Sequence, residues 1–369
     1  MKFIPIANPQ ISEEEAKAVY QIVKKGWISM GKNVRKLESK IENFLNVKNA
    51  ILFNNGTSSL NAALIALDIG PGDEVIVPTL SYISSANVIL YCGATPVFCE
   101  ADPRTFNTDW EKINNKITKK TKAIMTVDLK GMSVDYDEIK KKLKKYKIPL
   151  IADSAESFGA KYKNKFIGNQ FPMHSFSFFA NKNMTMGEGG LITCENQNVA
   201  KKIRIIRNQG QDGRYNHVLL GNNFRPTDYA AAIGLVQLTK INKVLDEKEK
   251  IAKIYNKAFK DSKNIETPYV PKYATRHSWY MYCLKLKKKS LRNKFIKYLQ
   301  KNEIDTRLSF PPIHLQPYYK KKFKYKKDSF PISEETFNSF VDIPCWMGMS
   351  KKQIFYIIKK INEFFKKHG

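Results

Sequence analysis

Residues 148–182 read IPLIADSAESFGAKYKNKFIGNQFPMHSFSFFANK, and this stretch decides which fold is expected. It holds two apolar runs of strand length, 149–152 and 175–179, and each precedes a side chain capable of chemistry, Asp153 and Lys182. Similar apolar runs lie at 74–78, 95–99, 123–127 and 190–194, with helical patterns at 57–67, 81–91, 135–146 and 199–208. Strands that alternate with helices predict an α/β fold, with a mainly parallel sheet covered by helices on both faces.

The chain is expected to divide into three parts. In residues 1–45, Ser12 and Glu15 have the spacing of a capping box and Gly26 can end a helix, so helices are predicted at 12–25 and 33–45. Residues 46–240 would form a large α/β domain. Residues 241–369 would form a smaller α+β domain, completed by the N-terminal helices, with a strand at 279–286 and helices at 240–261, 289–301 and 351–366.

The composition is that of a soluble globular protein, with 43% apolar and 26% charged residues among 369. The N-terminal segment MKFIPIANPQ has no apolar core of a signal peptide, and a cytoplasmic location without membrane contact is expected. The five cysteines are odd in number and form no C-x-x-C pair, and the five histidines are scattered. Neither a disulfide framework nor a metal site is predicted.

The net charge of +29, from 63 basic and 34 acidic residues, raises the possibility of a nucleic-acid partner. Residues 318–327 interleave aromatic residues with lysines, as proteins that bind single strands do. However, most of the excess is lysine scattered along the chain, which is typical of solvated helix faces. No helix-turn-helix, zinc-finger or RNP-type motif accompanies it. Nucleic-acid binding therefore stays a rival interpretation, and no nucleic-acid partner is predicted.

The sharpest chemical signal is Lys182. This lysine follows an apolar strand and precedes the glycine-rich turn Gly187-Glu188-Gly189-Gly190, which permits close approach of backbone to a ligand. A lysine among apolar neighbours has a lowered pKa, so its amine can attack a carbonyl and form a Schiff base. The alternative interpretation is a solvated strand end.

Two further segments match such a site. Asp153 ends a buried strand; it could cap the next helix, or keep the ring nitrogen of a pyridoxal cofactor protonated. Gly56, Thr57 and Ser58 open a helix directly after an apolar run, which could be an ordinary cap or an anion site.

In their order and spacing, these segments resemble the DegT/DnrJ/EryC1/StrS family of sugar aminotransferases, and in particular its perosamine-synthase-like members. The resemblance covers nearly the whole chain. It includes, besides the segments above, the motifs GWISMG (26–31), GPGDEVIVP (70–78), RNQG (207–210), GNNFRPTD (221–228), FPPIH (310–314) and DIP (342–344).

The resemblance implies the type I fold of aspartate aminotransferase, a homodimer with active sites at the interface, and pyridoxal 5′-phosphate (PLP) as cofactor. Lys182 would carry the cofactor as a Schiff base and Asp153 would pair with the ring nitrogen. The other cofactor residues implied are Thr57, Ser58 and Ser177 at the phosphate, Tyr82 stacked on the ring, Glu156 near the phenolic oxygen, and Asn223 reaching the neighbouring subunit's phosphate. Candidates for substrate binding are Trp27, Ser29, Arg225, Arg307 and His314.

The implied reaction transfers an amino group from L-glutamate to a nucleotide-diphosphate-linked 4-keto-6-deoxy sugar, with pyridoxamine 5′-phosphate (PMP) between the two half-reactions. The product would be a 4-amino sugar for surface-glycan biosynthesis. Two segments, Val127-Asp128-Leu129 and Leu308-Ser309-Phe310, depart from the family patterns. A 3-keto sugar, a cyclitol or a small phosphorylated ketone therefore stays open as the acceptor, and so does a cofactor-binding protein without catalysis.

Overall fold

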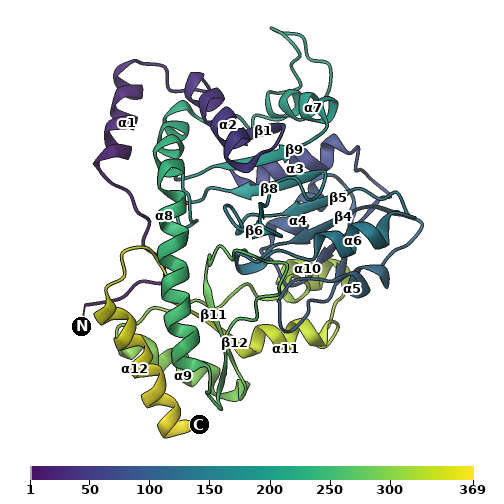
Figure 1. Ribbon diagram of the computed structural model, residues 1–369. Coiled ribbons are helices and arrows are strands. Elements are labelled where there is room, and N and C mark those ends of the chain that lie inside the picture. Colours follow the sequence, from purple (N-terminus) through teal and green to yellow (C-terminus); the bar gives the residue numbers. More distant parts are fainter. Residues whose placement is uncertain (1) are drawn as a thin grey trace.

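The computed structural model describes residues 2–369, and within them the central sheet has seven strands in the order β1-β9-β8-β5-β4-β2-β3 (Figure 1). β9 pairs antiparallel with β1 and with β8, and the remaining neighbours pair in parallel. The prediction of an α/β fold with a mainly parallel sheet is confirmed. The strands are β1 (Asn49–Phe53), β2 (Glu74–Pro78), β3 (Thr95–Cys99), β4 (Thr121–Val127), β5 (Leu150–Asp153), β8 (Met173–Ser177) and β9 (Gly190–Cys194).

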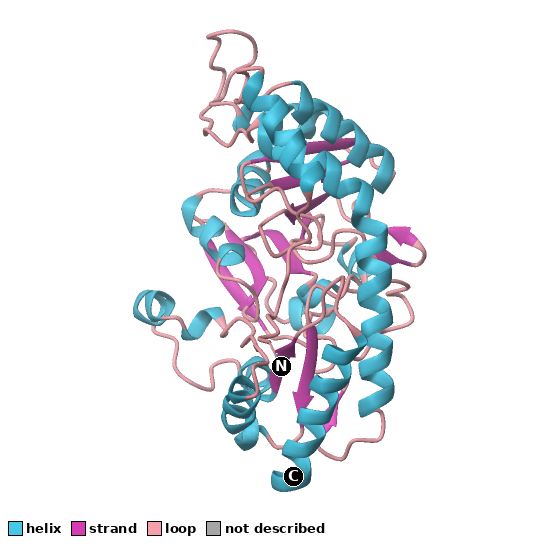
Figure 2. Ribbon diagram, turned by 90° about the vertical axis from the view of Figure 1, so that its left-hand side faces the viewer, coloured by secondary structure: helices cyan, strands magenta, loops and turns pink. Residues whose placement is uncertain are grey.

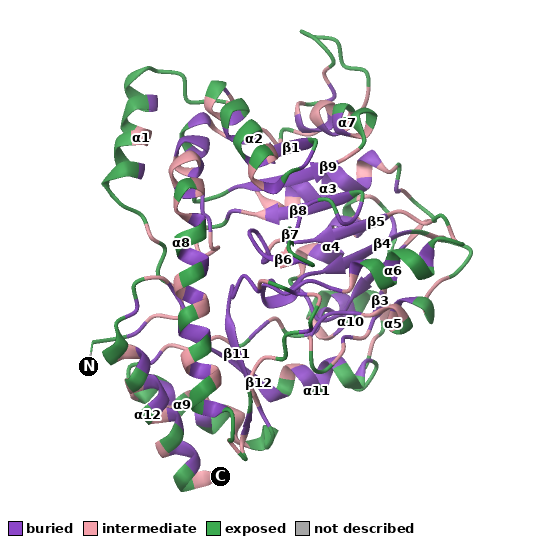
Figure 3. Ribbon diagram, in the orientation of Figure 1, coloured by how far each residue is buried: buried purple, intermediate pink, exposed green. Residues whose placement is uncertain are grey.

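Both faces of this sheet are buried. Successive side chains of a strand point to opposite sides of the sheet, so each strand contributes to an apolar cluster on either face. In β1, Ile51 and Phe53 join one apolar cluster, whereas Ala50 and Leu52 join another. The first cluster is covered by α3 (Gly56–Ala66), α4 (Ser84–Tyr91) and α7 (Gln197–Arg207), and the second by α2 (Lys32–Leu45), α6 (Tyr136–Leu143) and the first half of α8 (Asp228–Phe259). Most residues of these strands are buried and purple in Figure 3, which explains their nearly continuous apolar sequences.

A second, antiparallel sheet has the order β10-β11-β12 and lies below the first in Figure 1. Its strands are β10 (Ile265–Glu266), β11 (Tyr282–Leu286) and β12 (Phe340–Ile343). They share an apolar cluster with the second half of α8, α9 (Arg292–Lys301) and α12 (Lys351–His368). Two more helices, α10 (Pro317–Phe323) and α11 (Pro331–Ser339), follow α9 in the chain and precede β12.

The long helix α8 runs past both sheets (Figures 1 and 2). The boundary that the sequence predicts at residue 240 falls inside this helix. The division into domains therefore stays a prediction.

The N-terminal segment is fastened to α8. α1 (Glu13–Lys24) begins with the capping box that the sequence predicts, and Glu15 also accepts hydrogen bonds from Lys240 and Gln237 on α8. At the start of α2, both carboxylate oxygens of Asp228 accept N–H groups, from the Asn33 backbone at 2.9 Å, its side chain at 2.7 Å and the Val34 backbone at 3.1 Å. A negative charge at this end of a helix is favourable, so Asp228 fixes the entry into α2.

Most aromatic rings of the lysine-rich segment around α10 pack into the core. Tyr319 is fully buried, and the rings of Tyr319 and Tyr325 both lie 5.7 Å from that of Phe98 in the core. These rings are consequently not free to stack on bases. No helix within residues 2–369 has the length and apolar character that crossing a membrane requires.

Candidate active site

A cavity of about 630 Å³ lies where the parallel strands end. Its wall takes side chains from the segments that follow β2, β4, β5 and β8, and from the start of α3. In open α/β sheets ligands bind at this edge, because the carboxyl ends of the strands and the amino ends of the helices meet there. Among the predicted residues, those that line the cavity are Thr57, Ser58, Tyr82, Asp153, Glu156, Ser177, Lys182 and Arg307.

Lys182 lies in a tight turn after β8. Its backbone N–H donates to the Phe179 carbonyl at 3.0 Å, and the loop returns to the sheet through a bond from Met186 N to Phe178 O at 2.9 Å. The side chain is 13% exposed, with Nζ 3.7 Å from Glu156 Oε1 and 4.1 Å from the ring centre of Tyr280. The amine is thus held at the floor of the cavity.

The pKa of Lys182 differs in direction from the sequence prediction. Burial acts to lower the pKa of the amine, as expected for a lysine among apolar groups, but Tyr280, Glu156 and Asp153 outweigh it and raise the pKa. The sequence could not show this, because these neighbours come from other segments. The ammonium form is stabilised, so its proton must leave before the amine attacks a carbonyl.

Asp153, at the end of β5, is held by two donors. Ser85 Oγ donates to Oδ2 at 2.7 Å and Ala155 N donates to Oδ1 at 3.2 Å. Burial raises the pKa of this carboxyl, against the lowering effect of the hydrogen bonds. A protonated ring nitrogen facing the carboxylate would relieve the cost of burying its charge, so the residues present fit the ring of PLP.

The start of α3 provides an anion site. Asn55 caps the helix by accepting from Ser58 N at 2.8 Å, and Gly56, Thr57 and Ser58 all line the cavity. A Cβ on Gly56 would lie 3.0 Å from Ser177 Cβ, so glycine lets the helix start approach β8 closely. N–H groups at a helix start, together with serine and threonine hydroxyls, suit a phosphate group.

Two residues at this site give no local signal in the sequence: Lys130, which bonds to the cavity residue Glu156, and Tyr280, which lines the cavity. Lys130 adopts a left-handed conformation with φ of 62° and donates its backbone N–H to Glu156 Oε2 at 2.7 Å. Its ammonium group forms a buried ion pair with Asp342 of β12, with Nζ 2.6 Å from Oδ2. Tyr280 precedes β11, and its ring forms one side of the Lys182 site. These residues are recognisable only once the second sheet is placed against the first.

Tyr82 and Arg307 occupy the cavity mouth. The Tyr82 ring is 56% exposed and lies edge-on to Phe310 at 5.2 Å, and Arg307 Nη1 is 3.5 Å from the hydroxyl of Tyr280. Glu188 of the glycine-rich turn also lines the cavity.

Other predicted residues have side chains away from this cavity. His314 is fully buried, with Nδ1 2.7 Å from Thr79 Oγ1 and Nε2 3.0 Å from Glu334 Oε1. Burial lowers its pKa against the opposing effect of Glu334. Arg225 donates to Asn208 at 2.8 Å. The predicted residues outside the cavity lining are Trp27, Ser29, Asn223, Arg225 and His314.

A lysine amine, a buried carboxylate and a helix-start anion site at the strand ends define a PLP-dependent enzyme of the type I fold. The family model of the DegT/DnrJ/EryC1/StrS aminotransferases matches residues 9–362, and the chain belongs to that family. It is a sugar aminotransferase that depends on PLP. Within the described residues, no cluster of histidine, cysteine or acidic side chains could hold a metal ion.

Similar proteins include the GDP-perosamine synthases of Escherichia coli O157:H7 and of Caulobacter vibrioides. The first is 36% identical and the alignment covers 99% of both chains; the second is 37% identical and the alignment covers 98% of both. Among solved structures, the PLP form of Streptococcus pneumoniae Spr1654 superposes with a TM-score of 0.94 at 29% identity, covering 99% of both chains. The same protein has also been solved in a PMP form.

Proposed function

We propose that this chain transfers the amino group of L-glutamate to C4 of a nucleotide-diphosphate-linked 4-keto-6-deoxy sugar, for surface-glycan biosynthesis. The observation that carries the proposal is the meeting of Lys182, Asp153 and the start of α3 in one cavity. The cavity of about 630 Å³ lies in the range that small-molecule sites occupy. The names of the GDP-perosamine synthases support a nucleotide-linked sugar as the acceptor.

PLP, when bound, supplies an electron sink that makes the hydrogen on the donor's α carbon acidic. Lys182 would hold the cofactor and, once the donor has displaced it, would move a proton at Nζ. A base tethered in this way contributes about 10²–10⁴-fold to the rate. Glu156, 3.7 Å from Nζ, is placed to take or return the proton of the amine.

The remaining residues would orient and bind. Asp153 would keep a proton on the ring nitrogen, and the N–H groups at the start of α3 would hold the phosphate. Tyr82, exposed in the cavity, would cover the ring, and the guanidinium of Arg307 would attract a negatively charged group of donor or acceptor.

The homodimer is part of the proposal. Asn223 lies outside the cavity, at the end of a loop whose Tyr215, Val218 and Leu220 side chains are 76%, 53% and 90% exposed. Apolar groups exposed in this way suit a protein interface. Asn223 would then reach the phosphate site of the second subunit.

Mixing two inactive variants tests the dimer. Lys182→Ala and Asn223→Ala should each be inactive or strongly impaired, but a mixed dimer contains one site with both residues intact. We expect activity to reappear on mixing and subunit exchange, up to about one half of the sites in each mixed dimer. A monomer by light scattering, or no recovery from dimers shown to have exchanged, would refute a site shared between subunits.

A panel of acceptors tests the reaction. After the first turnover, the holoenzyme should release one molecule of 2-oxoglutarate from glutamate for each molecule of acceptor that is aminated. We expect 4-keto-6-deoxy nucleotide sugars to be the best acceptors, ahead of 3-keto sugars, cyclitols and small phosphorylated ketones. Lys182→Ala should be inactive, and Lys48→Ala, whose side chain is 74% exposed, should behave as wild type. A better rate with any other acceptor class would contradict the proposed substrate.

A further inference from the structure

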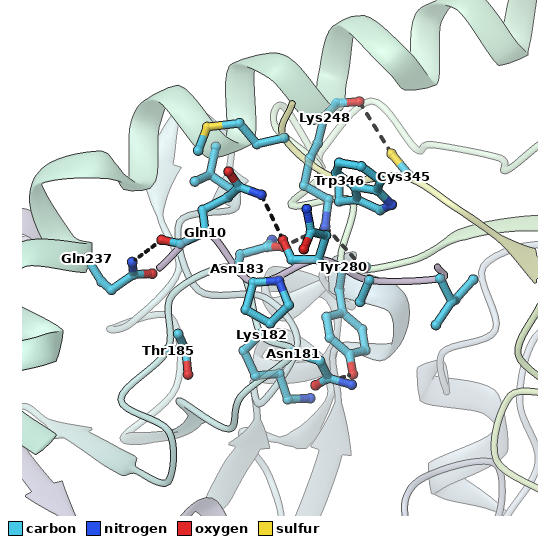
Figure 4. A pocket seen from close by; sticks show the side chains of 16 residues that line it. Gln10, Asn181, Lys182, Asn183, Thr185, Gln237, Lys248, Tyr280, Cys345 and Trp346 are labelled. Carbon is cyan, nitrogen blue, oxygen red and sulfur yellow. Dashed lines mark hydrogen bonds between the residues drawn. The ribbon is translucent and has the colours of Figure 1, made fainter. Parts of the chain in front are cut away.

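Behind the Lys182 turn lies a second cavity of about 30 Å³, shown in Figure 4. Asn181, Lys182 and Tyr280 line both this cavity and the large one, so they form the wall between the two. On the far side of that wall, Lys248 reaches down from α8. Lys248 is not among the site residues predicted from the sequence.

Lys248 is a buried amine whose acceptors are neutral. It is 5% exposed, and its Nζ donates to Asn183 Oδ1 at 2.7 Å and to the Tyr280 carbonyl at 3.2 Å. Burial lowers its pKa to about 8, and Cys345 acts in the opposite direction. Burying an amine without a carboxylate partner is unfavourable for folding.

Both acceptors of Lys248 belong to neighbours of Lys182. Asn183 follows it directly and also donates its Nδ2 to the Ser278 carbonyl at 2.7 Å. Tyr280 places its ring 4.1 Å from the Lys182 amine and donates its hydroxyl to Asn181 Oδ1 at 3.1 Å. Both neighbours of Lys182 are therefore tied to the segment of Ser278 and Tyr280, and Lys248 closes the network from α8.

We propose that Lys248 is a positioning residue for Lys182. Through Asn183 and the Tyr280 carbonyl, it fixes the backbone of the turn and the ring against which the Lys182 amine lies. In the proposed reaction Lys182 would be displaced and would return to the same place in every catalytic cycle, and a rigid turn would keep its amine within reach of the reacting carbon. This inference rests on the proposed role of Lys182.

The first test uses cofactor-free protein and does not depend on turnover. Lys182 is acetylated competitively with trace acetic anhydride, and the modified peptide is quantified by mass spectrometry. In Lys248→Met the turn loosens, and we expect the labelling of Lys182 to change by at least threefold. Lys253→Met makes the same replacement on α8 at a side chain that is 71% exposed, and its labelling should match wild type.

The second test separates positioning from general stability. A misplacement of about 1 Å near reacting atoms can cost about 10²-fold in rate. Lys248→Met should therefore lower the single-turnover release of 2-oxoglutarate from glutamate by 10- to 100-fold, while its melting temperature stays equal to that of wild type or rises. A role in stability alone predicts the opposite, a lower melting temperature with an unchanged rate in the folded fraction.

Asn183→Ala provides an independent variant, because it removes the acceptor and leaves the amine of Lys248 in place. We expect the same loss of rate, and no further loss in the double variant. Wild-type labelling and wild-type rate in Lys248→Met, or additive losses in the double variant, would overturn the inference. If borohydride reduction of the wild-type holoenzyme left Lys182 unmodified, the proposed function itself would fail, and that result is distinct from either of these.

Discussion

Replacing Lys130 by methionine tests how the two sheets are held together. In the structure, the ammonium of Lys130 donates to both oxygens of Asp342, at 2.8 and 2.6 Å, and the two side chains are 6% and 0% exposed. The Ser309 hydroxyl donates to the same carboxylate at 2.8 Å. The methionine variant would leave the charge of Asp342 buried without its cation.

The expected cost is large because the pair is buried. Removing one partner of such a pair typically destabilises a protein by about 3–5 kcal/mol, whereas replacing both by apolar residues is often nearly neutral. In a chain of 369 residues, that loss lowers the melting temperature by roughly 4–7 °C. Lys130→Met should show this decrease, and the double variant Lys130→Met/Asp342→Leu should recover most of it.

Calorimetry and urea denaturation of the cofactor-free protein measure the effect. Lys289→Met serves as the control, because its pair with Glu335 spans 3.4 Å and both side chains are more than half exposed. Such a surface pair contributes about 0–1 kcal/mol. Equal melting temperatures for Lys130→Met and the control, or a double variant less stable than the single one, would refute the reasoning.

Three further predictions concern single side chains. Asp153→Asn should retain PLP, seen by absorbance, but lose roughly 10²-fold or more in turnover, because an amide does not keep the ring nitrogen protonated. Asp228→Ala should cost about 1–2 kcal/mol and increase proteolysis at the start of α2, because the helix loses its cap. Burial acts to raise the pKa of Glu15, but hydrogen bonds from Lys240, Ser12 and Gln237 outweigh it and lower the pKa from 4.5 to about 2. Its ionised form therefore stabilises the fold above pH 4.5 by up to about 3 kcal/mol before screening, and this stabilisation is lost as the pH falls towards 2. In urea titrations between pH 5 and 3, the free energy of unfolding of Glu15→Gln should decline less than that of wild type.

The sequence predicts the large sheet well for a physical reason. Because both faces of that sheet are covered, its strands are nearly continuous apolar runs that stand out from the amphipathic helices between them. Lys182 and Asp153 reach the same edge of the sheet for a related reason, since Asp153 ends one such strand and Lys182 lies in the turn that follows another. The local sequence is sufficient to predict the position of a side chain where the strand itself brings that side chain to the edge of the sheet.

The other half of the active site could not be predicted in this way. Tyr280 and Arg307 enter the cavity from segments around the second sheet, and of these only Arg307 was predicted, as a candidate for substrate binding. Lys130, which bonds to the cavity residue Glu156, depends on a left-handed backbone at one position. The predicted lowering of the Lys182 pKa was wrong for the same reason, since the groups that raise it come from distant parts of the chain. The sequence offers His314 as a candidate for substrate binding, but its buried side chain is held by Thr79 and Glu334.

Helix α8 limits how the molecule can move. With 32 residues it is about 48 Å long, and it packs against the cores of both sheets without a break. Rotating one sheet away from the other would require bending this rod, whereas a hinge needs a few residues that can change their backbone angles freely. A bulky acceptor would therefore enter the active-site cavity without a rotation of the two sheets. Conformational changes during the cycle would be limited to side chains and short turns at the entrance of the cavity.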